Sequence, residues 1–259
     1  IELKPASLHS IMKIHKYIKT MRLVQKNILE FIEKETISSD DFQNLISFLN
    51  LQKINENIED LREILKLLVK ISRNHHRSFD FFERTEQIII YYQKEIKGNF
   101  SNYEIFDLFS SNKRLLLFLF EKKIIIPNKT IASIISNDKY LKYFYPQYFY
   151  PEMSLFFNKQ TRNKIESNDQ MIDYNSDEFQ NLRKLGENES YICQLIQKDS
   201  CIEFISYVNR NNISISTYLI SPSIFETNSF LMKNKPTLIE YSAFYGSIQI
   251  FKYLFFQRV

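Results

Sequence analysis

Residues 236–255 read PTLIEYSAFYGSIQIFKYLF and contain one of only three glycines in the 259-residue chain. Apolar side chains recur three and four positions apart on both sides of Gly246, which predicts two short helices, Thr237–Tyr245 and Ser247–Phe255. A glycine between two helices supplies the positive φ angle that a tight reversal needs. The small pair Ser242-Ala243, one turn earlier, allows the helices to approach closely. The sequence therefore predicts a helical hairpin with its turn at Gly246.

Similar short segments, separated by Asn, Ser and Lys, precede this hairpin from residue 99 onward. Aligning Ser200 with Gly246 places two helices in register at an offset of 46 residues, with Tyr207 over Tyr253. The excess over an ankyrin unit of about 33 residues is expected to form a long loop over Ser221–Lys235. Repeated pairs of short helices are typical of α-solenoids. The other expected short helices are Asn102–Ser110, Lys113–Lys123, Asn128–Ser136, Ser190–Lys198 and Cys201–Asn209.

The first 98 residues have longer apolar stripes, which predict a helical bundle. Ser38 or Ser39 is the expected cap of the second helix, and Gly98 is the expected C-terminal cap of the fourth. We therefore expect an all-α chain with two domains, a bundle over residues 1–98 and an ankyrin-like region of helical repeats over residues 99–259. The expected helices of the bundle are Ile11–Ile32, Phe42–Leu49, Ile58–Ile71 and Phe79–Lys97.

The composition disfavours several other classes of protein. The chain is 44% hydrophobic and 25% charged, which is typical of a globular protein. Three glycines and six prolines are too few for the turns of an all-β fold. The phosphate-binding patterns GxGxxG and GxxxxGKS/T are absent, and the net charge of +4 is too small to indicate nucleic-acid binding by itself.

The candidate reactive residues have no partners at motif spacing. His75 and His76 are adjacent, whereas two metal-binding histidines on one helix lie four residues apart. Cys193 and Cys201 lie on separate expected helices, form no CxxC pair and are interpreted as core residues of a protein in a reducing cytoplasm. No secretory signal is recognisable after Ile1. We expect no catalytic, cofactor-binding or metal-binding residue, and no enzymatic activity.

Two stretches leave alternatives open. The segment Tyr140–Met153 (YLKYFYPQYFYPEM) places aromatic rings beside Lys139 and Lys142, which suits RNA or another single-stranded nucleic acid bound over residues 139–153. The competing interpretation is an extended connector that buries the rings. The first helix has a basic face that suits an anionic membrane or an acidic partner, or that is simply solvated. Its basic residues are Lys13, Lys16, Lys19, Arg22 and Lys26.

Residues 237–255 resemble an ankyrin repeat. In the pattern T-P-L-H-x-A-A-x-x-G-H-x-x-V-V-x-L-L-L, Thr237 takes the place of the threonine and Gly246 that of the glycine. Leu238 replaces the proline and Glu240 replaces the histidine. The other matches are Ile239 with the first leucine, Ser242-Ala243 with the alanines, Ile250-Phe251 with the valines and Tyr253-Leu254-Phe255 with the last leucines.

The preceding sequence strengthens this resemblance. NKRLLLFLFEKKIIIP, YPQYFYPEM, ISYVNRNN and SIFETNSFLMKNKPTLIEY are similar to a domain of unknown function that precedes the ankyrin repeats in large protein families of parasitic protists. The resemblance implies a non-enzymatic scaffold that binds another protein and takes no small-molecule substrate. It also implies that the partner meets the loops and the first helices of the repeats, unless the aromatic residues there pack on a neighbouring repeat. The contact residues carried over are Asn234, Lys235, Glu240, Tyr241, Phe244 and Tyr245.

Overall fold

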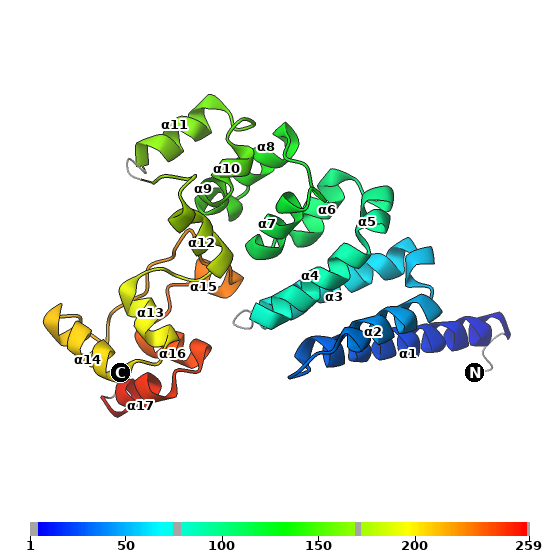
Figure 1. Ribbon diagram of the computed structural model, residues 1–259, viewed down its shortest axis with the longest axis horizontal. Helices are drawn as coiled ribbons and strands as arrows, with labels where there is room; N and C mark the ends of the chain where they lie inside the picture. Colours follow the sequence, from blue (N-terminus) through cyan, green and yellow to red (C-terminus); the bar gives the residue numbers. More distant parts are fainter. Residues whose placement is uncertain (1–4, 75–78, 169–171, 258–259) are drawn as a thin grey trace. The chain divides into compact units, whose positions relative to one another are not determined.

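The computed structural model describes residues 5–74, 79–168 and 172–257 of the chain. Within these ranges every regular element is helical, and Leu219 and Thr237 form an isolated antiparallel bridge (Figure 1). The prediction of an all-α chain is therefore confirmed. None of the helices described combines the length and apolarity needed to cross a bilayer. The adjacent histidines, His75 and His76, lie outside the described residues.

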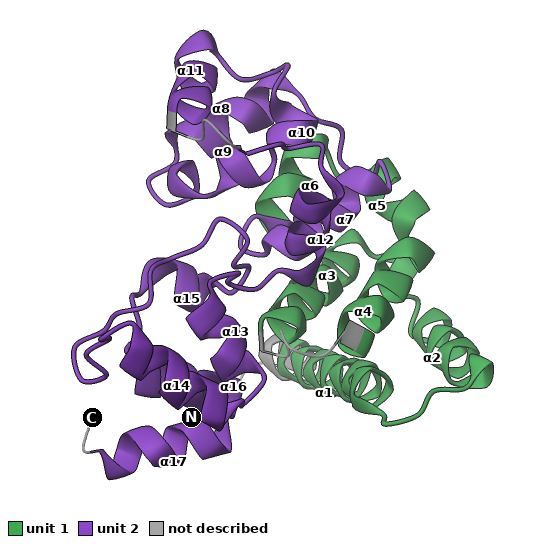
Figure 2. Ribbon diagram, turned by 60° about the vertical axis from the view of Figure 1, so that its left-hand side comes forward, with its two compact units in different colours: residues 1–108 green, residues 109–259 purple. Residues whose placement is uncertain are grey.

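The chain divides into two compact units, residues 1–108 and 109–259 (Figure 2). The division falls inside α6, whereas the sequence placed its boundary at Gly98. In unit 1, α1 packs against α2, α3 and α4, and its Ile28 and Ile32 are fully buried in the core. The elements that begin in this unit are α1 (Pro5–Glu33), α2 (Ser39–Leu51), a 3-10 turn (Ile54–Glu56), α3 (Ile58–Asn74), α4 (Phe79–Tyr91), α5 (Gln93–Asn99) and α6 (Asn102–Phe109).

Two helix ends in unit 1 test the capping predictions. Ser38 is the N-terminal cap of α2, as expected, and its backbone N–H donates to the Asp41 carboxylate at 2.8 Å. The prediction that Gly98 caps a single helix is wrong. That helix is interrupted after Tyr91, and Gly98 lies within α5, which ends where the buried Phe100 turns extended. The apolar Phe100 ends the helix by entering the core, so a left-handed glycine is not needed.

Unit 2 consists mostly of short helices. Those predicted from the sequence are present with ends that differ by a residue or two. The elements are α7 (Lys113–Glu121), α8 (Lys129–Asn137), a 3-10 turn (Leu141–Tyr143), α9 (Tyr145–Tyr148), α10 (Tyr150–Met153), α11 (Lys159–Asn168), α12 (Asp177–Leu185), α13 (Tyr191–Gln197), α14 (Cys201–Arg210), α15 (Ser229–Lys233), α16 (Leu238–Tyr245) and α17 (Ile248–Phe256).

The segment Tyr140–Met153 is helical, so the prediction of an extended connector is wrong. Pro146 and Pro151 each lie in the first turn of a one-turn helix, α9 and α10. In the first turn a backbone N–H has no partner within the helix, so proline loses nothing there. The two prolines start helices in this segment and do not prevent them.

Two helical hairpins lie side by side at the C-terminal end of unit 2. Helix α13 packs against α14 and α16, and α17 packs against α14 and α16, so that like helices of the two hairpins adjoin (Figure 1). The hairpins bury their side chains at matching positions and share one apolar core. The matching buried pairs, each 46 residues apart, are Ile192 and Leu238, Leu195 and Tyr241, Ile196 and Ser242, Phe204 and Ile250, and Val208 and Leu254.

The chain between the hairpins returns to the start of the second one. The backbone N–H of Ile220 donates to the carbonyl of Pro236 at 2.9 Å, beside the bridge between Leu219 and Thr237. The stretch Ser221–Lys235, expected as a long loop, contains the short helix α15 and buries part of its length, including Phe225. The excess over a plain helical repeat is therefore a folded part of unit 2.

Candidate functional site

The first hairpin (α13–α14) caps the start of α17, which is the second helix of the second hairpin (α16–α17). The Asp199 carboxylate accepts hydrogen bonds from the backbone N–H groups of Gln249 (3.0 Å) and Ile250 (3.0 Å). These N–H groups are in the first turn of α17, where no carbonyl of the same helix can reach them. The Ser247 hydroxyl donates to the carbonyl of Ile196, which adds a second polar link. The two hairpins are thus joined by specific hydrogen bonds as well as by their apolar core.

Helix α16 begins with a reciprocal pair of hydrogen bonds. The Glu240 backbone N–H donates to the Thr237 hydroxyl at 3.3 Å, and the Thr237 N–H donates to the Glu240 carboxylate at 2.8 Å. The Thr237 N–H and the Thr237 hydroxyl both donate to the Glu240 carboxylate, and these two hydrogen bonds hold the pKa of the carboxyl below its usual value. Glu240 stands where the ankyrin pattern has histidine. It caps the N-terminus of α16 together with Thr237. The sequence signal was present, since a threonine followed by glutamate three residues later is a capping box.

The six expected contact residues separate into two groups. Asn234, Lys235 and Glu240 are exposed, and Phe244 is half-buried. Tyr241 and Tyr245 are buried, their rings lie 4.7 Å apart, and burial raises the pKa of both hydroxyls. Because both tyrosines belong to the core shared by the hairpins, no partner reaches them while unit 2 is folded.

Phe230 joins the exposed group, although no pattern in the sequence pointed to it. It is 51% exposed and stacks on Phe244, with ring centroids 6.2 Å apart and planes at 15°. The Asn234 amide, at the end of α15, donates to the carbonyl of Phe230, in the first turn of the same helix, at 2.9 Å. Phe230 starts the apolar run FLM, and only the next two residues turn inward. The α15–α16 surface is defined as Phe230, Asn234, Lys235, Glu240 and Phe244.

The aromatic stretch 139–153 is buried in part. Tyr145, Tyr148 and Phe149 are buried, and the Tyr148 hydroxyl donates to the carbonyl of Arg183 at 2.9 Å. Tyr140 and Tyr143 remain exposed. Ammonium groups lie over both exposed rings, at 5.4 Å and 5.2 Å from Tyr140 (Lys139 and Lys233) and at 5.2 Å from Tyr143 (Lys142). Tyr140 and Tyr143 are therefore exposed rings with cations over them, and the other rings named above pack the core.

Buried charges hold the loop between the hairpins in place. Lys113 is fully buried, and its ammonium donates to the carbonyl of Ile224 at 2.6 Å and lies 4.6 Å from the Tyr148 ring. Burial lowers the pKa of Lys113 to about 7 and raises the pKa of Glu226 to about 7. The Glu226 carboxylate accepts from the backbone N–H of Asn228 at 2.7 Å. These groups are enclosed in the protein and serve its packing.

The two cysteines have the environment of packed thiols. Cys193 is buried in the shared core, and this burial raises its pKa to about 11. Burial also raises the pKa of Cys201. A thiol with a raised pKa is a poor nucleophile at neutral pH. Among the described residues, no group of three or more His, Cys, Asp or Glu side chains is placed to hold a metal ion.

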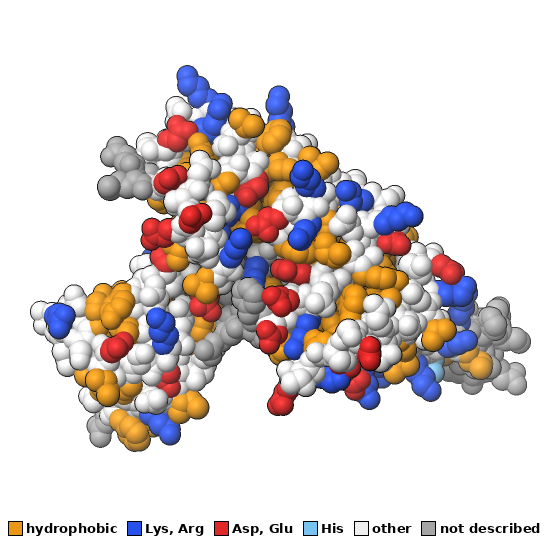
Figure 3. Space-filling view, viewed as in Figure 1, with side chains coloured by type: hydrophobic (Ala, Val, Ile, Leu, Met, Phe, Trp, Pro, Cys, Tyr) orange, Lys and Arg blue, Asp and Glu red, His pale blue; other side chains and the backbone are white. Residues whose placement is uncertain are grey.

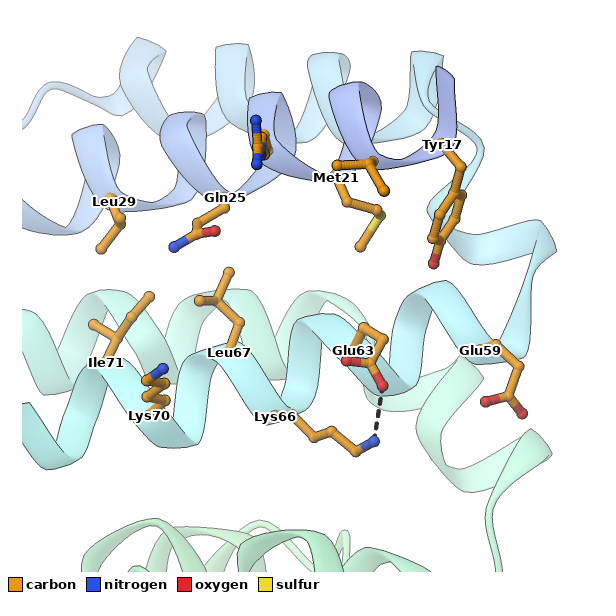
Figure 4. A pocket seen from close by; sticks show the side chains of 12 residues that line it. Tyr17, Met21, Gln25, Leu29, Glu59, Glu63, Lys66, Leu67, Lys70 and Ile71 are labelled. Carbon is orange, nitrogen blue, oxygen red and sulfur yellow. Dashed lines mark hydrogen bonds and ion pairs between the residues drawn. The ribbon is translucent and has the colours of Figure 1, made fainter. Parts of the chain in front are cut away.

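Unit 1 contains a groove of about 800 Å³. It runs between α1 and α3, with Met21 and Leu29 facing Leu67 and Ile71 across it (Figure 4). Its charged lining residues include Glu59, Glu63, Lys66 and Lys70 of α3 and Arg22 of α1. The groove is long and partly apolar, which suits a helix better than a small polar molecule.

Comparisons with known proteins add no relative. No family model, no curated protein and no solved structure matches this chain. A function for this chain must therefore be inferred from its own sequence and geometry.

Proposed function

We propose that residues 99–259 form an ankyrin-like helical scaffold, preceded by a helical bundle over residues 1–98, that binds another protein and catalyses no reaction. The observation that carries the proposal is the side-by-side packing of α13–α14 and α16–α17, with buried positions repeating at 46 residues. Stacked helical hairpins form rigid surfaces on which exposed side chains select a partner.

The resemblance of residues 237–255 to an ankyrin repeat gives further support. Gly246 has a φ of 65°, the left-handed conformation that the glycine of the pattern is expected to supply. Thr237 caps α16, as the threonine of the pattern is expected to do. These positions build a scaffold, and none of them performs a reaction.

The α15–α16 surface is the proposed contact face. It combines two stacked rings, Phe230 and Phe244, with the polar and charged side chains of Asn234, Lys235 and Glu240. Aromatic anchors surrounded by polar residues are typical of protein-binding sites, because the rings bury a large area at little cost in entropy. The partner is a protein with an apolar pocket for these rings.

The rival is a protein that binds single-stranded nucleic acid. The observation in its favour is the pair of exposed rings, Tyr140 and Tyr143, with lysine ammonium groups over both of them. The distribution of charge argues against it, because basic and acidic side chains are interspersed over the face drawn in Figure 3. A strong phosphate-binding surface has basic residues clustered on it.

One experiment separates these two functions. The 259-residue chain is used to capture proteins from its source cell, and each partner found is purified and titrated against the chain. Labelled single-stranded RNA is titrated in parallel over a range of salt concentrations. We expect saturable binding of a purified protein and weak RNA binding that disappears with salt. Tight RNA binding that Tyr140→Ala with Tyr143→Ala abolishes would overturn the proposal.

A further inference from the structure

Helix α1 has an apolar stripe that its neighbours leave uncovered near its N-terminal end. Ile11, Ile14 and Ile18 are exposed over 50%, 58% and 44% of their surface. At about 100° per residue these three side chains, together with Met21, fall on one face of the helix. The stripe leads directly into the groove between α1 and α3, because Ile18 and Met21 also line the groove.

The end of the groove nearest the stripe is acidic, whereas the edges of the stripe are basic. Further along α3, Lys66 and Lys70 also line the groove. The end of the groove nearest the stripe is marked by Tyr17, whose hydroxyl donates to Asp60 at 2.8 Å, and by Glu59 and Glu63. On α1, Lys13 and Arg22 lie at the two edges of the stripe, each about 80–100° from Ile14. Glu63 pairs with Lys66 at 2.7 Å, but both side chains are about half exposed, so a competing cation can replace that partner.

This arrangement is self-complementary. A twofold interface uses the same patch on both copies, so the patch must contain both members of each complementary pair. The patch on unit 1 does so, since it has an apolar stripe and an apolar groove, and basic edges beside an acidic end. A planar anionic membrane fits it less well, because the carboxylates of Glu59 and Glu63 lie at the hollow that would face the lipid.

We propose that unit 1 binds a second copy of this chain, with the Ile11–Ile18 stripe of each α1 lying in the α1–α3 groove of the other. The lysine and arginine at the edges of each stripe then meet Glu59 and Glu63 of the other copy. This inference concerns unit 1 alone and does not depend on the α15–α16 surface, so either proposal can fail without the other.

Sedimentation velocity over a range of protein concentrations tests the apolar contact. We expect the wild-type chain to form dimers and Ile14→Glu to raise the dissociation constant at least about tenfold. Leu23→Glu is the matched control, because Leu23 is 47% exposed on the same helix and lies half a turn away from Ile14. Equal melting temperatures for the two variants will establish that both are folded.

A charge exchange tests the polar contact. Lys13→Glu with Arg22→Glu, and separately Glu59→Lys with Glu63→Lys, are each expected to weaken the dimer. The chain that carries all four substitutions is expected to recover it, because each new carboxylate again meets a cation of the other copy. A wild-type chain that stays monomeric overturns the proposal, as does equal weakening by Leu23→Glu, no recovery on charge exchange, or binding to anionic vesicles without dimers.

Discussion

Gly246 and Asp199 are each the left-handed residue between the two helices of a hairpin, with φ angles of 65° and 52°, although the 46-residue register aligns Gly246 with Ser200. Glycine adopts this conformation without strain, and aspartate tolerates it better than most other residues. Asp199 adds what glycine lacks, a carboxylate that caps the neighbouring hairpin. Asp199 therefore makes the turn of the first hairpin and also joins it to the second hairpin.

Replacing Gly246 with valine is expected to lower the free energy of unfolding by more than about 1 kcal/mol, because a β-branched residue is strained at positive φ. Chemical denaturation of the full chain measures the change. Gly98→Ala is the control, since Gly98 lies within α5 and a Cβ there meets nothing within 4 Å. That substitution should stabilise by about 0.5–1 kcal/mol. A Gly246→Val variant as stable as wild type would contradict the ankyrin register.

Glu226 is expected to make stability depend on pH. Burial raises its pKa from the ordinary value of 4.5 to about 7, so the folded chain binds more protons than the unfolded chain between these values. This contribution to stability is complete below about pH 4.5 and is lost as the pH rises toward 7. Lys113 changes stability at higher pH. Burial lowers its pKa from 10.5 to about 7, so the unfolded chain binds more protons between these values, and the contribution of Lys113 to stability rises with pH there.

Glu226→Gln removes this titration. The loss of stability between about pH 5 and pH 7 should therefore shrink by on the order of 1 kcal/mol, measured by urea denaturation. Glu203→Gln is the control, because Glu203 is an exposed carboxylate of the same unit. An unchanged pH dependence in Glu226→Gln would show that Glu226 titrates normally in the folded chain.

At the scale of elements, apolar spacing was enough to predict most helices. Helices α7, α8, α13, α14, α16 and α17 of unit 2 appear where the three- and four-residue pattern places them, because each buries one face. The pattern did not predict α9, α10, α11, α12 or α15. The failures have physical causes. Proline disfavours a helix only after its first turn, so the prolines of the stretch 140–153 wrongly suggested extended backbone. For Tyr241 and Tyr245 the resemblance left two places open, the contact face and a packing surface on a neighbouring repeat. Spacing alone does not say which face of α16 the neighbouring hairpin covers, and both tyrosines lie in the core shared by the hairpins.

The joint between the hairpins gives a prediction at the same scale. Asp199→Gly keeps the left-handed turn but removes the hydrogen bonds to the start of α17, so it should cost about 1–2 kcal/mol. Asp199→Asn keeps an acceptor and should cost less than half as much. Equilibrium unfolding of both variants measures the difference. If Asp199→Gly is as stable as wild type, the first hairpin does not hold the second through this residue.

At the scale of the whole molecule, each unit offers its own surface. Unit 1 has the α1–α3 groove, and unit 2 has the α15–α16 surface on one side of its stacked hairpins. The resemblance to an ankyrin repeat gave Asn234, Lys235, Glu240 and Phe244 as contact residues of this second surface, and Phe230 was added from the structure. Since α15 lies within a polar loop, no periodic pattern pointed to that ring. We propose on these grounds that the protein presents binding surfaces and is not a catalyst.

The most direct test of this central claim is a binding titration of the captured and purified partner against two double variants. Phe230→Ser with Lys235→Glu changes the α15–α16 surface and should weaken binding at least about tenfold, with an unchanged melting temperature. Ile202→Ser with Lys252→Glu changes exposed apolar and basic residues elsewhere on unit 2 and should bind as wild type. Equal affinity of all three chains, or equal weakening by both variants, would contradict the claim.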